Sequence, residues 1–215
     1  MYDLILFDLD GTLTDPAEGI TNSVRHALAK RGIFVSDRTA LYKFIGPPLI
    51  DSFMQFYGYT HAEAVQGVED YREYYADRGI WENKVYPGIP ELLADLKAAG
   101  KTVAMATSKP EYFAIQIAEH FGIAQYFDLI AGSTMDETRT KKSDVITYAL
   151  AQLGADTAHV VMVGDRSYDV LGAKALGLPC IGVTFGYGSE EELRTAGAAA
   201  IAHDADDLHR LLLTD

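Results

Sequence analysis

The sequence predicts a doubly wound α/β fold, in which a mostly parallel sheet forms a core and a helical cap is inserted after the first strand. Two observations predict it. From residue 102 onward, short and continuously apolar runs alternate with helical patterns, as in a sheet covered on both faces. Residues 15–83 instead carry helical patterns without convincing strands. One α/β domain with a long helical start is the alternative, but an N-terminal strand needs partners that come only after residue 100.

The expected Rossmann-like core therefore comprises residues 1–14 and 84–215, and the expected helical cap comprises residues 15–83. Apolar runs of strand length predict the sheet, at Leu4–Phe7, 102–106, 129–131, 159–163 and Cys180–Val183. Helical spacing followed by glycine predicts core helices near 89–96, 113–121 and 145–153. In the cap, the pattern Asp15-Pro16-Ala17-Glu18 predicts a helix capped by Asp15, and Thr60 with Glu63 predicts a second capping box.

Composition and charge exclude several classes of protein and several kinds of partner. Of the 215 residues, 48% are hydrophobic and 23% are charged, which excludes a disordered chain and a coiled coil. The net charge of -13 repels phosphate backbones and anionic lipid, so we expect no nucleic-acid polymer and no membrane as partner. A small phosphorylated substrate stays compatible, because a metal ion can reverse the local field. The single cysteine, Cys180, predicts a reducing compartment, and we expect a cytoplasmic enzyme.

Two acids, Asp8 and Asp10, follow the first apolar run directly. Open α/β sheets place their active sites at this end of a strand. Side chains two apart share one face of an extended chain, and Gly11 permits a sharp turn after them. Two such carboxylates repel each other unless a cation or a proton intervenes, so the pair indicates a divalent metal or one protonated acid. A solvated turn is the alternative for the pair taken alone.

A second acidic motif follows the strand expected at 159–163. Asp165 comes just after this run, and Asp169 falls in the first turn of the next helix. Hard oxygen ligands from two strand ends suit Mg²⁺. For Asp169, the alternative interpretation is an acid that interacts only with the helix dipole.

Hydroxyl and lysine residues complete the pattern. Thr107 and Ser108 end the strand expected at 102–106, where a hydroxyl and backbone N–H groups can hold a phosphate, although an ordinary Ser/Thr cap is the alternative. Lys141 and Lys142 precede a predicted helix, and one of them could meet the phosphate and reduce carboxylate repulsion. We prefer Lys142; a solvated pair is the alternative for either residue.

These four segments, in this order, resemble the haloacid dehalogenase superfamily of phosphatases, and the resemblance covers nearly the whole chain, including the inserted cap. It implies that Asp8 is the nucleophile and Asp10 the general acid/base. It also implies that Thr107, Ser108 and Lys142 bind the substrate phosphate. The implied cofactor is Mg²⁺, held by Asp8, the Asp10 carbonyl, Asp165 and Asp169.

Within the superfamily, the sequence is similar to phosphoglycolate phosphatases and to a 5′-nucleotidase-like branch. Arg166, where Ser or Thr is usual, and Lys142-Ser143 in place of K-P-x-P favour the nucleotidase-like branch. The implied function is hydrolysis of a small phosphorylated metabolite, either phosphoglycolate or a nucleoside 5′-monophosphate. A phosphosugar mutase and a catalytically silent binding protein on the same scaffold are the alternatives.

Residues of the cap are candidates for selecting the leaving group. Lys43 is a possible cation for an anionic substrate. Phe53, Tyr57 and Tyr75 have helical spacing, and we interpret them mainly as core packing.

Overall fold

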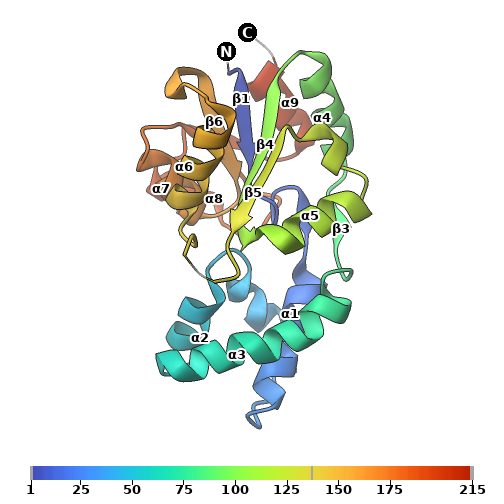
Figure 1. Ribbon diagram of the computed structural model, residues 1–215, viewed down its shortest axis with the longest axis vertical. Helices are drawn as coiled ribbons and strands as arrows, with labels where there is room; N and C mark the ends of the chain where they lie inside the picture. Colours follow the sequence, from blue (N-terminus) through green and yellow to red (C-terminus); the bar gives the residue numbers. More distant parts are fainter. Residues whose placement is uncertain (1, 137, 214–215) are drawn as a thin grey trace. The chain divides into compact units, whose positions relative to one another are not determined.

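A six-stranded sheet forms the centre of the α/β part of the chain, within the residues that the computed structural model describes, 2–136 and 138–213 (Figure 1). Its strand order is β5-β4-β1-β6-β7-β8, and each neighbouring pair is parallel. The strands are β1 (Leu4–Phe7), β4 (Thr102–Pro110), β5 (Leu129–Ser133), β6 (Val160–Gly164), β7 (Cys180–Val183) and β8 (Ala200–Ala202). The predicted fold class is therefore confirmed.

The chain divides into two compact units. The α/β unit comprises Met1–Asp15 and Val85–Asp215, and the helical unit comprises Pro16–Lys84. Residues 1, 137, 214 and 215 of the predicted core lie outside the described part. Two short strands, β2 (Thr14–Asp15) and β3 (Lys84–Val85), pair with each other where the chain passes between the units. Neither strand was predicted from the sequence.

Strand β1 lies between β4 and β6, and this placement sets the position of the site. Its four residues are all buried, because both faces of the sheet are covered. Phe7 is in register with Met105 of β4 and with Val163 of β6. The segments that follow β1 and β6 therefore begin side by side, next to the continuing strand β4, at the carboxyl edge of the sheet, where open α/β sheets bind ligands.

Helices cover both faces of the sheet (Figure 1). On one face, α6 (Lys142–Leu153), α7 (Ser167–Lys174) and α8 (Glu190–Ala196) pack on a cluster that includes Leu4 and Leu6. Helices α4 (Ile89–Ala98), α5 (Glu111–His120) and α9 (Ala205–Leu213) lie on the other face. The three helices predicted between the later strands are thus present.

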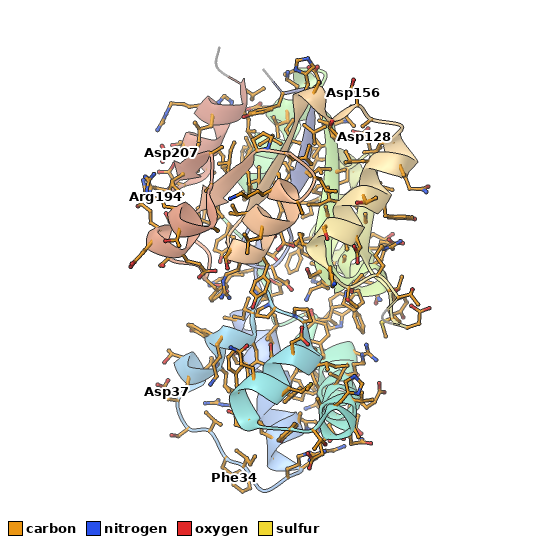
Figure 2. All side chains as sticks on the ribbon, turned by 90° about the vertical axis from the view of Figure 1, so that its left-hand side faces the viewer. Phe34, Asp37, Asp128, Asp156, Arg194 and Asp207 are labelled. Carbon is orange, nitrogen blue, oxygen red and sulfur yellow. The ribbon has the colours of Figure 1, made fainter. Side chains whose placement is uncertain are left out.

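Aspartates in the α/β unit also accept backbone hydrogen bonds far from the carboxyl edge. Asp128 accepts a hydrogen bond of 2.9 Å from the N–H of Val103, near the start of β4 (Figure 2). Asp156 caps the short helix η4 (Thr157–His159) by accepting from the N–H of Ala158 at 3.0 Å. Asp156 therefore holds a local turn, as acids commonly do, whereas Asp128 joins two segments that are 25 residues apart in the chain.

The helical unit contains α1 (Ala17–Ala29), α2 (Leu49–Tyr57) and α3 (His61–Tyr74), with a 3-10 helix η1 (Arg38–Phe44) and a π-helix η2 (Tyr75–Gly79). The predicted capping box of Thr60 and Glu63 at the start of α3 is confirmed. The predicted Asp15 cap is wrong, because α1 begins at Ala17 without a side-chain cap. Asp15 is extended in β2, and its carboxylate accepts a hydrogen bond from the Tyr187 hydroxyl.

Aromatic packing and ion pairs hold the helical unit together. Phe53 is fully buried and stacks on Tyr59, with ring centroids 5.6 Å apart, so it packs in the core as expected. Tyr75 is also buried. Lys43 is exposed, and its Nζ lies 4.5 Å from the centre of the Phe56 ring, which is a cation–π contact. The proposed role of Lys43 in substrate binding stays a prediction.

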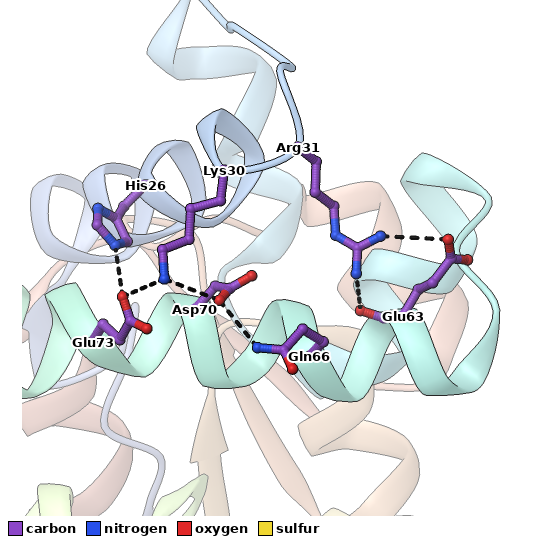
Figure 3. A network of polar contacts seen from close by, with 7 residues as sticks. All are labelled: His26, Lys30, Arg31, Glu63, Gln66, Asp70 and Glu73. Carbon is purple, nitrogen blue, oxygen red and sulfur yellow. Dashed lines mark hydrogen bonds and ion pairs between the residues drawn. The ribbon is translucent and has the colours of Figure 1, made fainter.

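Helices α1 and α3 are joined by charged side chains (Figure 3). Lys30 Nζ lies 3.1 Å from Asp70 Oδ1 and 2.5 Å from Glu73 Oε2. Arg31 pairs with Glu63 at 3.4 Å. The Lys30 side chain keeps 38% of its exposure, so this network lies at the surface of the helical unit.

Candidate active site

Three buried carboxylates meet at the carboxyl edge of the sheet. Asp8 directly follows β1, Asp165 directly follows β6, and Asp169 lies in the first turn of α7. One oxygen from each lies within 4.8 Å of the other two. The parallel register of β1 and β6 produces this convergence, as the sequence motifs led us to expect.

Glycines make room for these acids. Gly11 has φ of 81°, and a Cβ built on it would lie 2.2 Å from Asp165 Oδ2. A Cβ on Gly164 would lie 2.2 Å from the carboxyl carbon of Asp169. Both distances are shorter than any real contact allows, so a larger residue would displace the acids. The positive φ at Gly11 adds a second reason for glycine there.

Lys142 bridges two of the three carboxylates. Its Nζ lies 2.9 Å from Asp8 Oδ1 and 2.8 Å from Asp169 Oδ1, and it donates a hydrogen bond of 3.0 Å to the carbonyl of Ala106. Lys141, in contrast, is exposed and immediately precedes α6. Of the two lysines considered from the sequence, Lys142 is therefore the one that the structure places among the acids.

Burial and mutual charge shift the pKa values of these groups. Burial tends to lower the pKa of Lys142, but the carboxylates of Asp169 and Asp8 outweigh this effect and raise it well above its usual range. Burial, and then the neighbouring Asp169, raise the pKa of Asp165. Burial raises the pKa of Asp169 to about 6, although Lys142 opposes the shift. The site therefore carries more negative charge than one lysine relieves.

The donor set fits a hard divalent cation. Asp165 Oδ2 accepts a hydrogen bond of 2.8 Å from the N–H of Tyr187. Asp165 Oδ1 is buried and has no hydrogen-bond partner among the residues that the structure describes. A buried carboxylate oxygen of this kind is costly unless a ligand satisfies it. Mg²⁺ takes such oxygens, and the two neighbouring carboxylates supply more of them.

Asp10 lies outside this group of three. Its Oδ2 forms an ion pair of 2.7 Å with Nζ of Lys109, whose side chain is only 5% exposed. Burial raises the pKa of Asp10, and Lys109 opposes that effect. Lys109 was not among the predicted site residues, because the apolar run that predicts β4 ends at residue 106. With β4 extended to Pro110, the two-residue period of a strand places positions 107 and 109 on one face, which is the signal that could have found it.

The hydroxyl segment lies next to the acids. Thr107 is buried at the end of β4, and its hydroxyl accepts a hydrogen bond of 3.2 Å from the N–H of Lys109. Ser108 is half-buried. Because Lys142 contacts the carbonyl of Ala106, the residue before Thr107, the expected phosphate-binding segment and the lysine share one edge of the sheet.

Arg166 makes contacts through both its backbone and its side chain. Its N–H donates a hydrogen bond of 3.0 Å to Asp169 Oδ2, which satisfies an open N–H at the start of α7. The guanidinium Nε lies 3.1 Å from Glu192 Oε1, which also accepts from the N–H of Ser167 at 2.8 Å. Asp169 is thus both an acid at a helix N-terminus and a member of the carboxylate group, so the two interpretations of this residue are compatible.

The fold and the site together define an α/β enzyme with an acidic site at the carboxyl edge of a parallel sheet. The family model described as "Haloacid dehalogenase-like hydrolase" matches residues 5–183. The chain belongs to this family, as its four motifs indicated. In the described residues, no helix is long and apolar enough to cross a membrane.

Curated relatives resemble the chain over nearly its whole length. A 5'-nucleotidase from Pseudomonas aeruginosa is 49% identical over 98% of this chain and 96% of its own. The tyrosine-protein kinase PtkA from Mycobacterium tuberculosis is 42% identical over 97% of this chain and 72% of its own. A phosphoglycolate phosphatase from Yersinia pseudotuberculosis is 33% identical over 94% of this chain and 90% of its own.

A solved structure with a similar sequence also has the same fold. The crystal structure of a predicted phosphatase from Clostridium acetobutylicum is 50% identical in sequence and covers 99% of both chains, with a TM-score of 0.97. The protein is therefore an enzyme of the haloacid dehalogenase-like hydrolase family, and it resembles the phosphatases of that family.

Proposed function

We propose that this protein is a Mg²⁺-dependent phosphomonoester hydrolase that forms an aspartyl-phosphate on Asp8. The observation that carries the proposal is the convergence of Asp8, Asp165 and Asp169 within 4.8 Å, beside the buried Lys142. This arrangement concentrates negative charge next to a carboxylate that can act as a nucleophile. It therefore needs a cation and can accept a phosphoryl group.

The metal would be held by the carboxylates of Asp8, Asp165 and Asp169 and by the backbone carbonyl of Asp10. When bound, Mg²⁺ neutralises the clustered carboxylates and polarises a phosphate oxygen. The unpartnered Oδ1 of Asp165 supports this assignment.

Asp8 is held in a defined orientation. Its Oδ1 accepts a hydrogen bond of 2.8 Å from the N–H of Leu9 and lies 2.9 Å from Lys142 Nζ. Both contacts involve Oδ1, so we assign the attack to Oδ2. In the first step Oδ2 bonds to phosphorus, and the bond from phosphorus to the leaving oxygen breaks. Thr107, the Ser108 N–H and Lys142 stabilise the charge on the transferring group.

Asp10 supplies and then removes a proton. Because burial raises its pKa, Asp10 retains a proton at a higher pH than an ordinary aspartate does, which suits a general acid. It donates this proton to the leaving alcohol. As a carboxylate, it then takes a proton from the water that attacks the phosphorus of the aspartyl-phosphate, which releases inorganic phosphate and restores Asp8.

We infer that the substrate is a small phosphorylated metabolite, either a nucleoside 5′-monophosphate or phosphoglycolate. The names of the 49% and 33% identical relatives support these two classes. The net charge of -13 disfavours a nucleic-acid polymer as substrate. We also expect a cytoplasmic location, as predicted from the sequence.

A screen for phosphate release across these compounds and sugar phosphates, ranked by kcat/KM, tests the proposal. Release is expected with Mg²⁺ and should stop with chelator. No release from any phosphomonoester would contradict the proposal, and isomerisation of a glucose phosphate without release would indicate a mutase.

A second candidate is phosphoryl transfer from a nucleoside triphosphate to tyrosine, which the name of the 42% identical relative favours. It shares the acidic site but uses a different acceptor. Incubation with ATP and a tyrosine peptide distinguishes the two. Under the hydrolase proposal, phosphate goes to water and the peptide stays unmodified.

A further inference from the structure

Lys109 and Asp10 form a buried ion pair beside the three carboxylates. Lys109 Nζ lies 2.7 Å from Asp10 Oδ2, and the two side chains are 5% and 12% exposed. Removing two charges from water is costly, so such a pair is weak support for stability by itself. We propose that Lys109 is a positioning residue that holds the carboxylate of Asp10 in place for its proton transfer; this inference rests on the proposed function.

Hydrogen bonds within the turn hold the backbone around Asp10, but they do not hold its carboxylate. The N–H groups of Thr12, Leu13 and Thr14 donate to the carbonyl of Leu9 at 3.2, 2.9 and 3.0 Å, which holds the turn after β1. These contacts leave the side-chain torsions of Asp10 undetermined. The ion pair with Lys109 determines them, because Lys109 is anchored in β4, the strand next to β1.

The two oxygens of Asp10 have different surroundings. Oδ2 faces the ammonium of Lys109. Oδ1 is buried and has no hydrogen-bond partner in the described part of the chain. A buried oxygen without a hydrogen-bond partner is unfavourable, and native proteins keep such groups mainly where they have a catalytic or ligand-binding role. Lys109 thus occupies one oxygen, and the other remains available for the proton that goes to the leaving group.

The two buried lysines of the site contact different carboxylates. Lys142 contacts Asp8 and Asp169, whereas Lys109 contacts Asp10. The nucleophile and the general acid are therefore held by separate cations. Loss of Lys109 should affect the proton transfer without displacing Asp8.

This separation gives a test based on the leaving group. Ethyl phosphate releases a basic alkoxide, which needs a proton, whereas p-nitrophenyl phosphate releases a phenolate that leaves without one. The value of kcat/KM reports the steps up to phosphoryl transfer to Asp8. Lys109→Met should lower the ratio of kcat/KM for ethyl phosphate to that for p-nitrophenyl phosphate by about tenfold or more.

Lys101 offers a matched control in the same unit. It immediately precedes β4, its side chain is 8% exposed, and its Nζ lies 3.7 Å from Asp3 Oδ1. Lys101→Met removes a buried lysine and its aspartate contact at the other end of the strand. It should leave the ratio unchanged.

A double-mutant cycle shows whether Lys109 acts through Asp10. In an Asp10→Asn background, Lys109→Met should not lower the ratio further, because residues that act as a unit are not additive. If Lys109→Met does not fold, Lys109→Gln removes the ammonium but keeps a polar end group in the buried site, and it should also lower the ratio.

Two outcomes overturn the proposal: an unchanged ratio, which includes an equal loss for both esters, or a further fall in the Asp10→Asn background. A wild-type protein that releases phosphate from neither ester overturns the proposed function, and this inference with it. An active wild type with an unchanged ratio in the Lys109 variants overturns this inference alone.

Discussion

Two lysines in this chain each contact two carboxylates, in two different regions. Lys142 of the α/β unit lies 2.9 Å from Asp8 and 2.8 Å from Asp169. Lys30 of the helical unit lies 3.1 Å from Asp70 and 2.5 Å from Glu73. The distances are similar, but the Lys142 side chain is 4% exposed and that of Lys30 is 38% exposed.

Burial of all members, rather than contact geometry, distinguishes these clusters: Asp70 is buried, but Lys30 and Glu73 reach the solvent, whereas every member of the Lys142 cluster is buried. Water screens the charges around Lys30, so each pair adds little, and the cluster joins two helices (Figure 3). The charges around Lys142 have lost their hydration, and the attraction between them offsets only part of the free energy that this costs. A group of buried acids with too few cations is a poor structural device but a suitable site for a metal and a phosphoryl group.

The largest expected effect comes from the nucleophile. Asp8→Asn should lower phosphate release by roughly three orders of magnitude or more, because the amide cannot form the covalent intermediate. Steady-state kinetics with a saturating phosphomonoester measures it. The matched control is Asp70→Asn, which alters a buried acid beside Lys30 and should leave kcat unchanged. Wild-type turnover in Asp8→Asn would refute the assignment.

Exchange of the two lysines for methionine sharpens the comparison. Lys142→Met should lower kcat by about a hundredfold, because it removes a cation from the transferring phosphoryl group and from Asp8. Lys30→Met should keep the wild-type kcat. Equal kcat values in the two variants would show that burial does not separate a functional cluster from a structural one.

Metal removal should change stability in a pH-dependent way. The pKa of Asp169 is raised from 3.8 to about 6 in the metal-free protein, and burial raises that of Asp165 too. Between the ordinary and raised values the folded protein binds more protons than the unfolded one, so the free energy of unfolding falls as pH rises through this window. Mg²⁺ binds the deprotonated carboxylates and should offset that loss.

The increase in Tm on exchanging chelator for Mg²⁺ should therefore be larger at about pH 7 than at about pH 5. Thermal unfolding by circular dichroism measures it. Asp165→Asn is the control and should reduce the increase. An equal increase at both pH values would contradict the assigned metal ligands.

The smallest effect is expected in the helical unit. The hydrogen bond from Lys30 lowers the pKa of Glu73, so the stabilisation is present above the ordinary pKa of glutamate and is lost as pH falls through the lowered value. At neutral pH, Lys30→Met should lower the urea midpoint slightly. Because exposed pairs are screened, the difference should vanish in about 1 M salt. A large difference that persists in salt would mean that this cluster is not governed by solvent screening.

Much of the α/β unit could be predicted because its strands are continuously apolar. Runs such as Leu4–Phe7 and Cys180–Val183 became strands with unchanged bounds. Strand β8 (Ala200–Ala202) could not be found this way, since a short alanine-rich segment has little strand preference and takes its conformation from its pairing with β7. Asp15 was misassigned because its cap pattern competes with pairing between β2 and β3.

The site was predictable to the extent that it depends on strand ends. Asp8 and Asp165 follow neighbouring parallel strands, so their convergence follows from topology. Lys142 could be preferred to Lys141 only weakly from the sequence, because the choice depends on how α6 is rotated against the sheet. The contact of Lys109 with Asp10 depends on the register between β1 and β4 and on the length of β4.

The most direct test of a nucleophilic Asp8 in a metal-dependent site is to find the phosphoryl group on it. Wild-type protein is mixed with Mg²⁺ and a reactive phosphomonoester, quenched in acid and digested, and the peptides are analysed by mass spectrometry. The account predicts the added mass of one phosphoryl group on the peptide that contains Asp8, and its absence with chelator or in Asp8→Asn. Turnover with the phosphoryl group on a different residue would contradict it.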